Sequence, residues 1–185
     1  MAMLRRARSY LVDHPSAVTL AIFILVLAHL IVATWISQVA PPALFVNVAA
    51  KALPAAVSSL AVGVASVAAM VGGFAGVVVV FGLSSDDERF RQVRLKASTS
   101  LRRNWMSVVT TPLFAAFGSM LAATLATAGF IPAALWLLEL CTLLAAHGAL
   151  RLVVLLSELV RVVHAADEAQ KTQDDEIDTD EFLGG

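Results

Sequence analysis

Four long runs of apolar residues, separated by short polar or charged segments, dominate the chain. The runs cover about residues 16–38, 54–83, 105–130 and 133–163. A helix needs roughly 20 apolar residues to cross the hydrocarbon core of a bilayer, and each run reaches that length. The pattern therefore predicts an all-α, polytopic membrane protein, in which four transmembrane helices pack as a bundle.

The fourth run is longer than one membrane crossing requires. As a helix, residues 133–163 measure about 45 Å, whereas the hydrocarbon core is about 30 Å thick. We therefore place the fourth span at about residues 133–152 and expect the helix to leave the bilayer near Arg151. The same helix should then continue into the cytosol over about residues 153–166 and complete a membrane domain of residues 16–166.

Basic residues alternate between the segments that connect these runs. Short segments rich in lysine and arginine stay in the cytosol. Two segments have this character, residues 1–15 with Arg5, Arg6 and Arg8, and residues 84–104 with Arg89, Arg91, Arg94, Lys96, Arg102 and Arg103. The segment between the first two runs has only Lys51, and the short reversal at Gly129 and Pro132 has no basic residue. Four spans with both termini in the cytosol, in the cell membrane, satisfy this distribution.

The basic N-terminus before an apolar run is also typical of a secretory signal peptide. The first apolar run, however, exceeds the roughly 7–15 residues of a cleavable signal segment. The one small-residue cleavage candidate, Ala40, is followed directly by Pro41. We therefore interpret the first run as an uncleaved membrane anchor.

The composition supports a membrane protein and argues against several functional classes. Hydrophobic residues make up 59% of the 185 positions, against roughly 45–50% in soluble domains, and the formal net charge is only -1. Cys141 is the only cysteine, so one chain cannot form a disulfide or a thiolate metal cage. No nucleotide-binding, hydrolase or metalloprotease motif occurs. We expect no enzymatic activity, no cofactor and no nucleic-acid partner.

Small residues recur at helical spacing in the second and third runs. Such residues let membrane helices approach closely, because packing rather than water drives helix association in lipid. The candidates for close packing are Ala61, Ala65, Ala69, Gly72, Gly73 and Gly76 in the second run and Gly118 in the third. Two interpretations stay open, packing between helices of one chain and packing between copies in a homo-oligomer.

Four ionisable residues fall inside the predicted spans. Ionisable side chains in a membrane are costly and mark functional sites by default. The four are His29, Glu139, His147 and Arg151, of which the last three form a stripe along the fourth helix. They could line or gate a water-filled path for ions or protons. Alternatively they could form a polar clamp, with Glu139 or His147 bonded to a hydroxyl of Thr110, Thr111, Ser119 or Thr124.

The predicted cytosolic segments carry most of the charge. After a capping box, Phe90, Val93, Ala97 and Leu101 share one face of a helix, so residues 84–104 should contain a basic amphipathic helix. Its basic residues could contact lipid headgroups or dock a protein partner. Residues 167–185, which are rich in acidic side chains, should form a disordered tail.

Two functional classes follow from this organisation. The first is a homo-oligomeric ion channel or pore, with the second helix between copies and the polar stripe of the fourth helix facing the conduit. The second is a non-conducting scaffold or accessory subunit, which recruits a membrane or cytosolic protein through the basic loop and the acidic tail. A small secondary transporter is less well supported, because no inverted repeat of broken helices is found.

Overall fold

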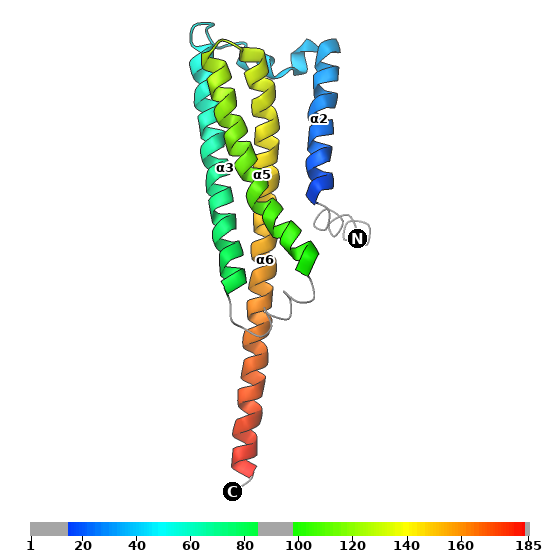
Figure 1. The fold of residues 1–185 in the computed structure, drawn as a ribbon, viewed down its shortest axis with the longest axis vertical. Helices are drawn as coiled ribbons and strands as arrows, with labels where there is room; N and C mark the ends of the chain where they lie inside the picture. Colours follow the sequence, from blue (N-terminus) through cyan, green and yellow to red (C-terminus); the bar gives the residue numbers. More distant parts are fainter. Residues whose placement is uncertain (1–14, 85–97, 184–185) are drawn as a thin grey trace. The chain divides into compact units, whose positions relative to one another are not determined.

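A computed structural model of the protein describes residues 15–84 and 98–183, and every regular element in these ranges is helical (Figure 1). The long helices are α2 (Pro15–Trp35), α3 (Leu53–Ser84), α5 (Ser98–Thr127) and α6 (Ile131–Leu183). Two short 3-10 helices, η1 (Ser37–Val39) and η2 (Pro41–Phe45), connect α2 to α3. The predicted all-α class is confirmed.

Each long helix contains a stretch that is long and apolar enough to cross a bilayer. The four stretches are Ser16–Trp35, Leu53–Val80, Met106–Thr127 and Ile131–Ser157. They coincide closely with the four predicted spans, and they indicate an integral membrane protein in contact with the lipid bilayer. The orientation across that membrane stays a prediction.

A tight reversal joins α5 to α6. Gly129 has a φ of 89°, in the left-handed region that glycine adopts without steric cost. The amide N–H of Phe130 donates to the carbonyl of Leu125 at 2.9 Å, and that of Gly129 donates to Ala126 at 3.1 Å. These two bonds form a Schellman cap, which ends α5 and turns the chain back. The antiparallel hairpin predicted from Gly129 and Pro132 is present.

The core of the bundle lies between α3, α5 and α6 and consists largely of alanine. One cluster joins Val57 and Ala61 of α3 to Ala122 and Ala126 of α5 and to Leu138 of α6. A second cluster brings together Ala68, Ala115, Cys141 and Leu144. Such small side chains allow the three helix backbones to approach closely, as helix packing in lipid requires.

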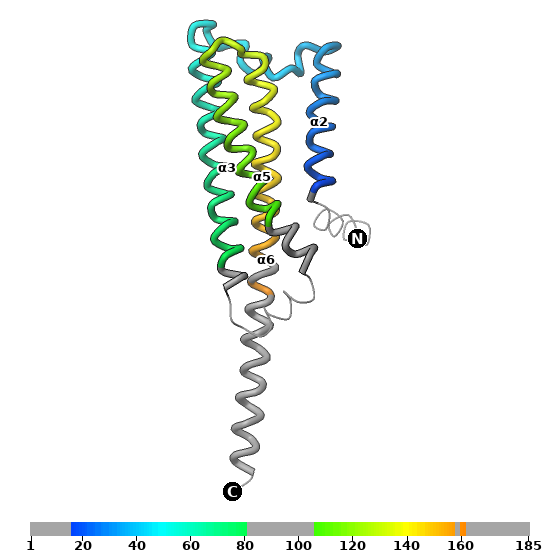
Figure 2. The backbone as a smooth tube through the Cα atoms, in the orientation of Figure 1, coloured from blue at the N-terminus to red at the C-terminus, as the bar shows by residue number. Residues whose placement is uncertain are grey.

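The helix α2 makes much less contact with the rest of the chain. None of the residues in its apolar window is buried, against 22%, 33% and 28% for the windows of α3, α5 and α6. Its least exposed side chains include Ile22, Val26, His29 and Ala33, which lie on one face. The backbone trace shows α2 beside the other helices rather than among them (Figure 2). A single polar contact can therefore matter greatly for its position.

The structure differs from the predicted boundaries in three places. The helix α5 begins at Ser98, so Pro112 lies inside it and not in its first turns. The segment expected to form a separate amphipathic helix thus partly belongs to α5, and residues 85–97 lie outside the described residues. The helix α6 continues to Leu183, where we predicted disorder from residue 167.

Contacts divide the chain into two units at the boundary between Arg151 and Leu152. The first unit holds α2, α3, α5 and the first part of α6, and all the packing described above lies within it. The second unit is the remainder of α6. The limits that we proposed for the membrane domain and its cytosolic extension remain predictions.

Candidate functional site

An ionisable pair joins α2 to α6. The Nδ1 atom of His29 lies 2.6 Å from Oε1 of Glu139, across 110 positions of sequence. The other ring nitrogen of His29, Nε2, lies 2.9 Å from the carbonyl oxygen of Val39 in η1. Both ring nitrogens are therefore engaged, one with the carboxylate and one with the backbone.

Both contacts of His29 are satisfied when its ring carries two protons. A carbonyl oxygen can only accept, so Nε2 of His29 must be the donor in the contact with Val39. A proton on Nδ1 then donates to the carboxylate oxygen of Glu139. The resulting pair of imidazolium and carboxylate has no net charge, which lowers the cost of placing it inside a membrane.

Trp136 of α6 packs against the imidazole ring of His29. Its indole and the imidazole of His29 meet edge to face, with ring centroids 5.2 Å apart and an interplanar angle of 71°. Trp136 precedes Glu139 by three residues, so both side chains project from the same face of α6. The second carboxylate oxygen of Glu139, Oε2, is buried and has no hydrogen-bond partner among the described residues. His29 is thus the side chain that neutralises this carboxylate.

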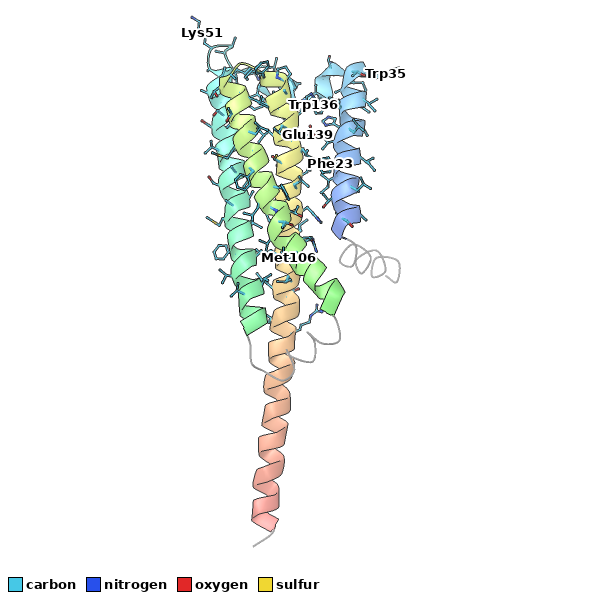
Figure 3. The ribbon with its side chains drawn as sticks, in the orientation of Figure 1. Phe23, Trp35, Lys51, Met106, Trp136 and Glu139 are labelled. Carbon is cyan, nitrogen blue, oxygen red and sulfur yellow. The ribbon has the colours of Figure 1, made fainter. Side chains whose placement is uncertain are left out.

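An apolar groove of about 400 Å³ runs beside the pair, between α2 and α6. Figure 3 shows Phe23, Trp136 and Glu139 in the region where these two helices face each other. Pockets of roughly 300–1,000 Å³ are typical of small-ligand sites. The groove is lined by Leu20, Phe23, Ile24, Val26, Leu27, Leu30 and Trp136. The side chains that line this groove are all apolar or aromatic.

A second polar contact joins α5 to α6 further along the bundle. The guanidinium of Arg151 donates from Nη1 to the hydroxyl of Ser107. Close by, Gly148 faces Pro112, and a Cβ at position 148 would lie 3.1 Å from the proline ring. His147 lies in the same region, and its Nε2 atom is buried without a hydrogen-bond partner among the described residues. The polar stripe predicted for this helix is thus divided between two different neighbours, α2 and α5.

The small residues predicted for close packing in the second run do not all lie on one face of α3. On α3 the buried positions are spaced by three or four residues, at Val57, Ala61, Ala65, Ala68, Gly72 and Ala75. Ala69 and Gly73 are exposed. A strict four-residue spacing drifts by about 40° per step around a helix, so a row that starts at Ala61 leaves the interface after two steps. Only some of the small residues predicted for close packing on α3 are therefore buried in the contact with α5.

Glycines mark the closest approaches between helices. A Cβ on Gly72 of α3 would lie 3.2 Å from the side chain of Leu113 in α5. A Cβ on Gly118 of α5 would lie 2.5 Å from Sγ of Cys141 in α6. Gly76, four residues after Gly72 on the same helix, has nothing within 4 Å of its Cβ position. The structure therefore places two of the predicted packing glycines between helices of one chain and leaves Gly76 open.

Four of the six basic residues predicted to contact lipid headgroups or a partner lie outside the described residues. Arg89, Arg91, Arg94 and Lys96 lie in residues 85–97, outside the described ranges, and Arg102 and Arg103 belong to α5. Their assignment to lipid headgroups or a partner stays a prediction.

Sequence reasoning missed the partner of Glu139. One of the two interpretations bonded Glu139 or His147 to a hydroxyl of Thr110, Thr111, Ser119 or Thr124, whereas the structure places His29 of α2 against Glu139. The hydroxyl of Thr124 instead donates to the Met120 carbonyl of its own helix at 3.0 Å. One signal was available, because His29 and Glu139 lie at comparable distances from helix ends that meet on one side of the bundle.

Comparisons with protein-family models, with curated proteins and with solved structures found no match. Within residues 15–84 and 98–183, no group of three histidine, cysteine, aspartate or glutamate side chains is placed to hold a metal ion.

Proposed function

We propose that this chain is a non-conducting membrane scaffold or accessory subunit. One observation supports this choice over a channel: two of the ionisable side chains on α6 are bonded within the chain. Glu139 bonds to His29, and Arg151 bonds to Ser107. An ion path needs polar groups that face an open conduit. Here the same groups hold helices together.

The interior of the bundle also favours a scaffold. Alanine and glycine fill the space between α3, α5 and α6, and the groove between α2 and α6 is apolar. In a bilayer, such a groove is a surface on which the apolar side chains of another membrane component can pack. The basic loop and the acidic tail would then recruit the cytosolic part of the same partner.

Ion flux through liposomes tests this proposal. We expect purified protein, reconstituted at known density, to leave potassium and proton flux at the level of protein-free liposomes. Glu139→Gln and His147→Ala should give the same background flux, because neither side chain lines a conduit. A flux above background that either substitution changes would contradict the scaffold and favour a channel.

A channel built from several copies is the second candidate, and one observation favours it. On α3, a Cβ at Gly63, Gly73 or Gly76 would meet nothing within 4 Å. A surface of this kind on a membrane helix can pack against a second copy of the chain. The same surface can equally face lipid.

Two glycine substitutions separate the packing within one chain from the packing between copies. Gly72→Leu should reduce stability, because Leu113 lies in the way, whereas Gly76→Leu should leave stability unchanged within about 0.5 kcal/mol. The mass of each variant in nanodiscs, measured by light scattering, gives the number of copies. If wild type forms a ring and Gly76→Leu abolishes it without loss of stability, α3 mediates assembly. An unchanged mass would exclude this surface.

A further inference from the structure

The groove between α2 and α6 is long and narrow. Its lining residues extend from Leu20 to Leu30 along α2, a rise of about 15 Å. Its volume of about 400 Å³, divided by this length, gives a mean cross-section of about 27 Å². A helix with its side chains is about 10–12 Å across and needs roughly 80–110 Å². The groove is therefore too narrow for a helix of a second copy or of a partner protein.

A single hydrocarbon tail matches the groove in size and chemistry. Carbon atoms in contact are about 4 Å apart, so an extended tail occupies a cross-section of roughly 16 Å². The residues that line the groove are all apolar or aromatic and belong to the candidate membrane spans, where lipid tails are the surrounding medium. Near Leu30, the contact of His29 with Glu139 joins the two helices, so a tail in the groove would end there.

Arg151 of α6 lies just beyond the other end of the groove. The helix α2 and the first part of α6 run antiparallel (Figure 1), and His29 is level with Glu139 because the two side chains are in contact. From this level, Leu20 lies about 14 Å along α2, and Arg151 lies about 18 Å in the same direction along α6. Around α6, Arg151 is about 60° from Trp136, which lines the groove. A headgroup at Arg151 would thus be in line with a tail in the groove.

The side chain of Arg151 suits a lipid phosphate. It is partly buried, and its Nη1 donates to the hydroxyl of Ser107, which holds the guanidinium between α5 and α6. Figure 3 shows Met106, the residue before Ser107, near the level at which α2 begins. A guanidinium presents its N–H donors as a planar fork that fits phosphate oxygens. Basic side chains between membrane helices bind anionic lipid headgroups in this way.

We propose that the groove and Arg151 together form a binding site for one anionic membrane lipid. One tail lies in the groove between Leu20 and Leu30, and the phosphate accepts hydrogen bonds from the guanidinium of Arg151. The site does not depend on the proposed scaffold function, because lipid binding is measured on the chain alone. The two proposals can therefore fail separately.

Quenching of Trp136 fluorescence by brominated lipids tests the site. The full-length chain carries Trp35→Phe and Trp105→Phe, so that Trp136 is its only tryptophan. It is placed in phosphatidylcholine nanodiscs with increasing fractions of phosphatidylglycerol that is brominated near the end of one tail. We expect the quenching to saturate at a low fraction of this lipid. Brominated phosphatidylcholine should need a fraction about fivefold higher, which is the effect of one cationic side chain on an anionic headgroup.

Two pairs of matched variants test the two parts of the site. Leu27 lines the groove and Leu25 does not, although they are 57% and 58% exposed. Leu27→Phe should raise the half-saturating fraction about fivefold or more through overpacking, and Leu25→Phe should leave it unchanged. Arg151→Gln should abolish the preference for phosphatidylglycerol. Arg161→Gln makes the same change further along α6 and should keep that preference.

Several results would overturn the proposal. Quenching that rises in proportion to the fraction of brominated lipid, without saturation, would mean that Trp136 meets only bulk lipid. No quenching at any fraction would mean that a protein surface covers the groove. A preference for phosphatidylglycerol that survives Arg151→Gln, or equal effects of Leu27→Phe and Leu25→Phe, would place the lipid elsewhere.

Discussion

Replacing His29 with leucine should lower the free energy of unfolding by about 2 kcal/mol, which is less than for a fully buried ion pair because the side chains of His29 and Glu139 are 31% and 23% exposed. The substitution leaves Glu139 without the side chain that neutralises it. In lipid a lone carboxylate is costly, because neither water nor a counter-charge compensates for it. Denaturant unfolding in mixed micelles, followed by circular dichroism, measures the loss.

The control for this prediction is His147→Leu. His147 also lies within a span, but its Nε2 atom makes no hydrogen bond in the described structure. Its replacement should therefore change stability by less than about 1 kcal/mol. Equal losses for the two histidines would mean that membrane depth, rather than the bond to Glu139, sets the cost.

Gly118→Val should destabilise the bundle by about 1–3 kcal/mol through overpacking. The new Cβ would lie 2.5 Å from the sulfur of Cys141, closer than any van der Waals contact, and the branched side chain leaves little room to adjust. The cost arises because α5 and α6 must separate or Cys141 must leave its buried position. The same unfolding assay measures it.

Gly63→Val is the matched control for Gly118→Val. It makes the same chemical change within a membrane helix, but a Cβ at Gly63 has nothing within 4 Å. Both variants share any effect of valine on helix propensity, so the difference between them reports packing alone. If the two variants were equally stable, the conclusion that α5 and α6 approach closely at Cys141 would be wrong.

The four spans and the hairpin could be predicted from sequence because each depends on local information. The length of an apolar run determines whether a helix can cross a bilayer. The Gly129–Pro132 reversal leaves α5 and α6 no alternative to an antiparallel arrangement. These features require no knowledge of which helix touches which.

The candidate site could be predicted only in part. Depth in the membrane identified His29 and Glu139 as unusual, but their pairing depends on how α2 sits against α6, across 110 positions of sequence. The burial of the small residues of α3 could likewise be predicted only in part. Four-residue spacing indicates close packing, yet the drift around the helix decides that Ala65 is buried and Ala69 is exposed. Packing partners, rather than composition, determine both outcomes.

A double-mutant cycle on His29→Leu and Glu139→Leu measures whether these two residues are bonded to each other and hold α2 on α6. We predict a coupling energy of about 1–3 kcal/mol, with the double variant more stable than either single variant, since an apolar pair replaces an ion pair well. If the two single losses simply added, with a coupling energy near zero, the two residues would be independent and the bond between α2 and α6 would be wrong.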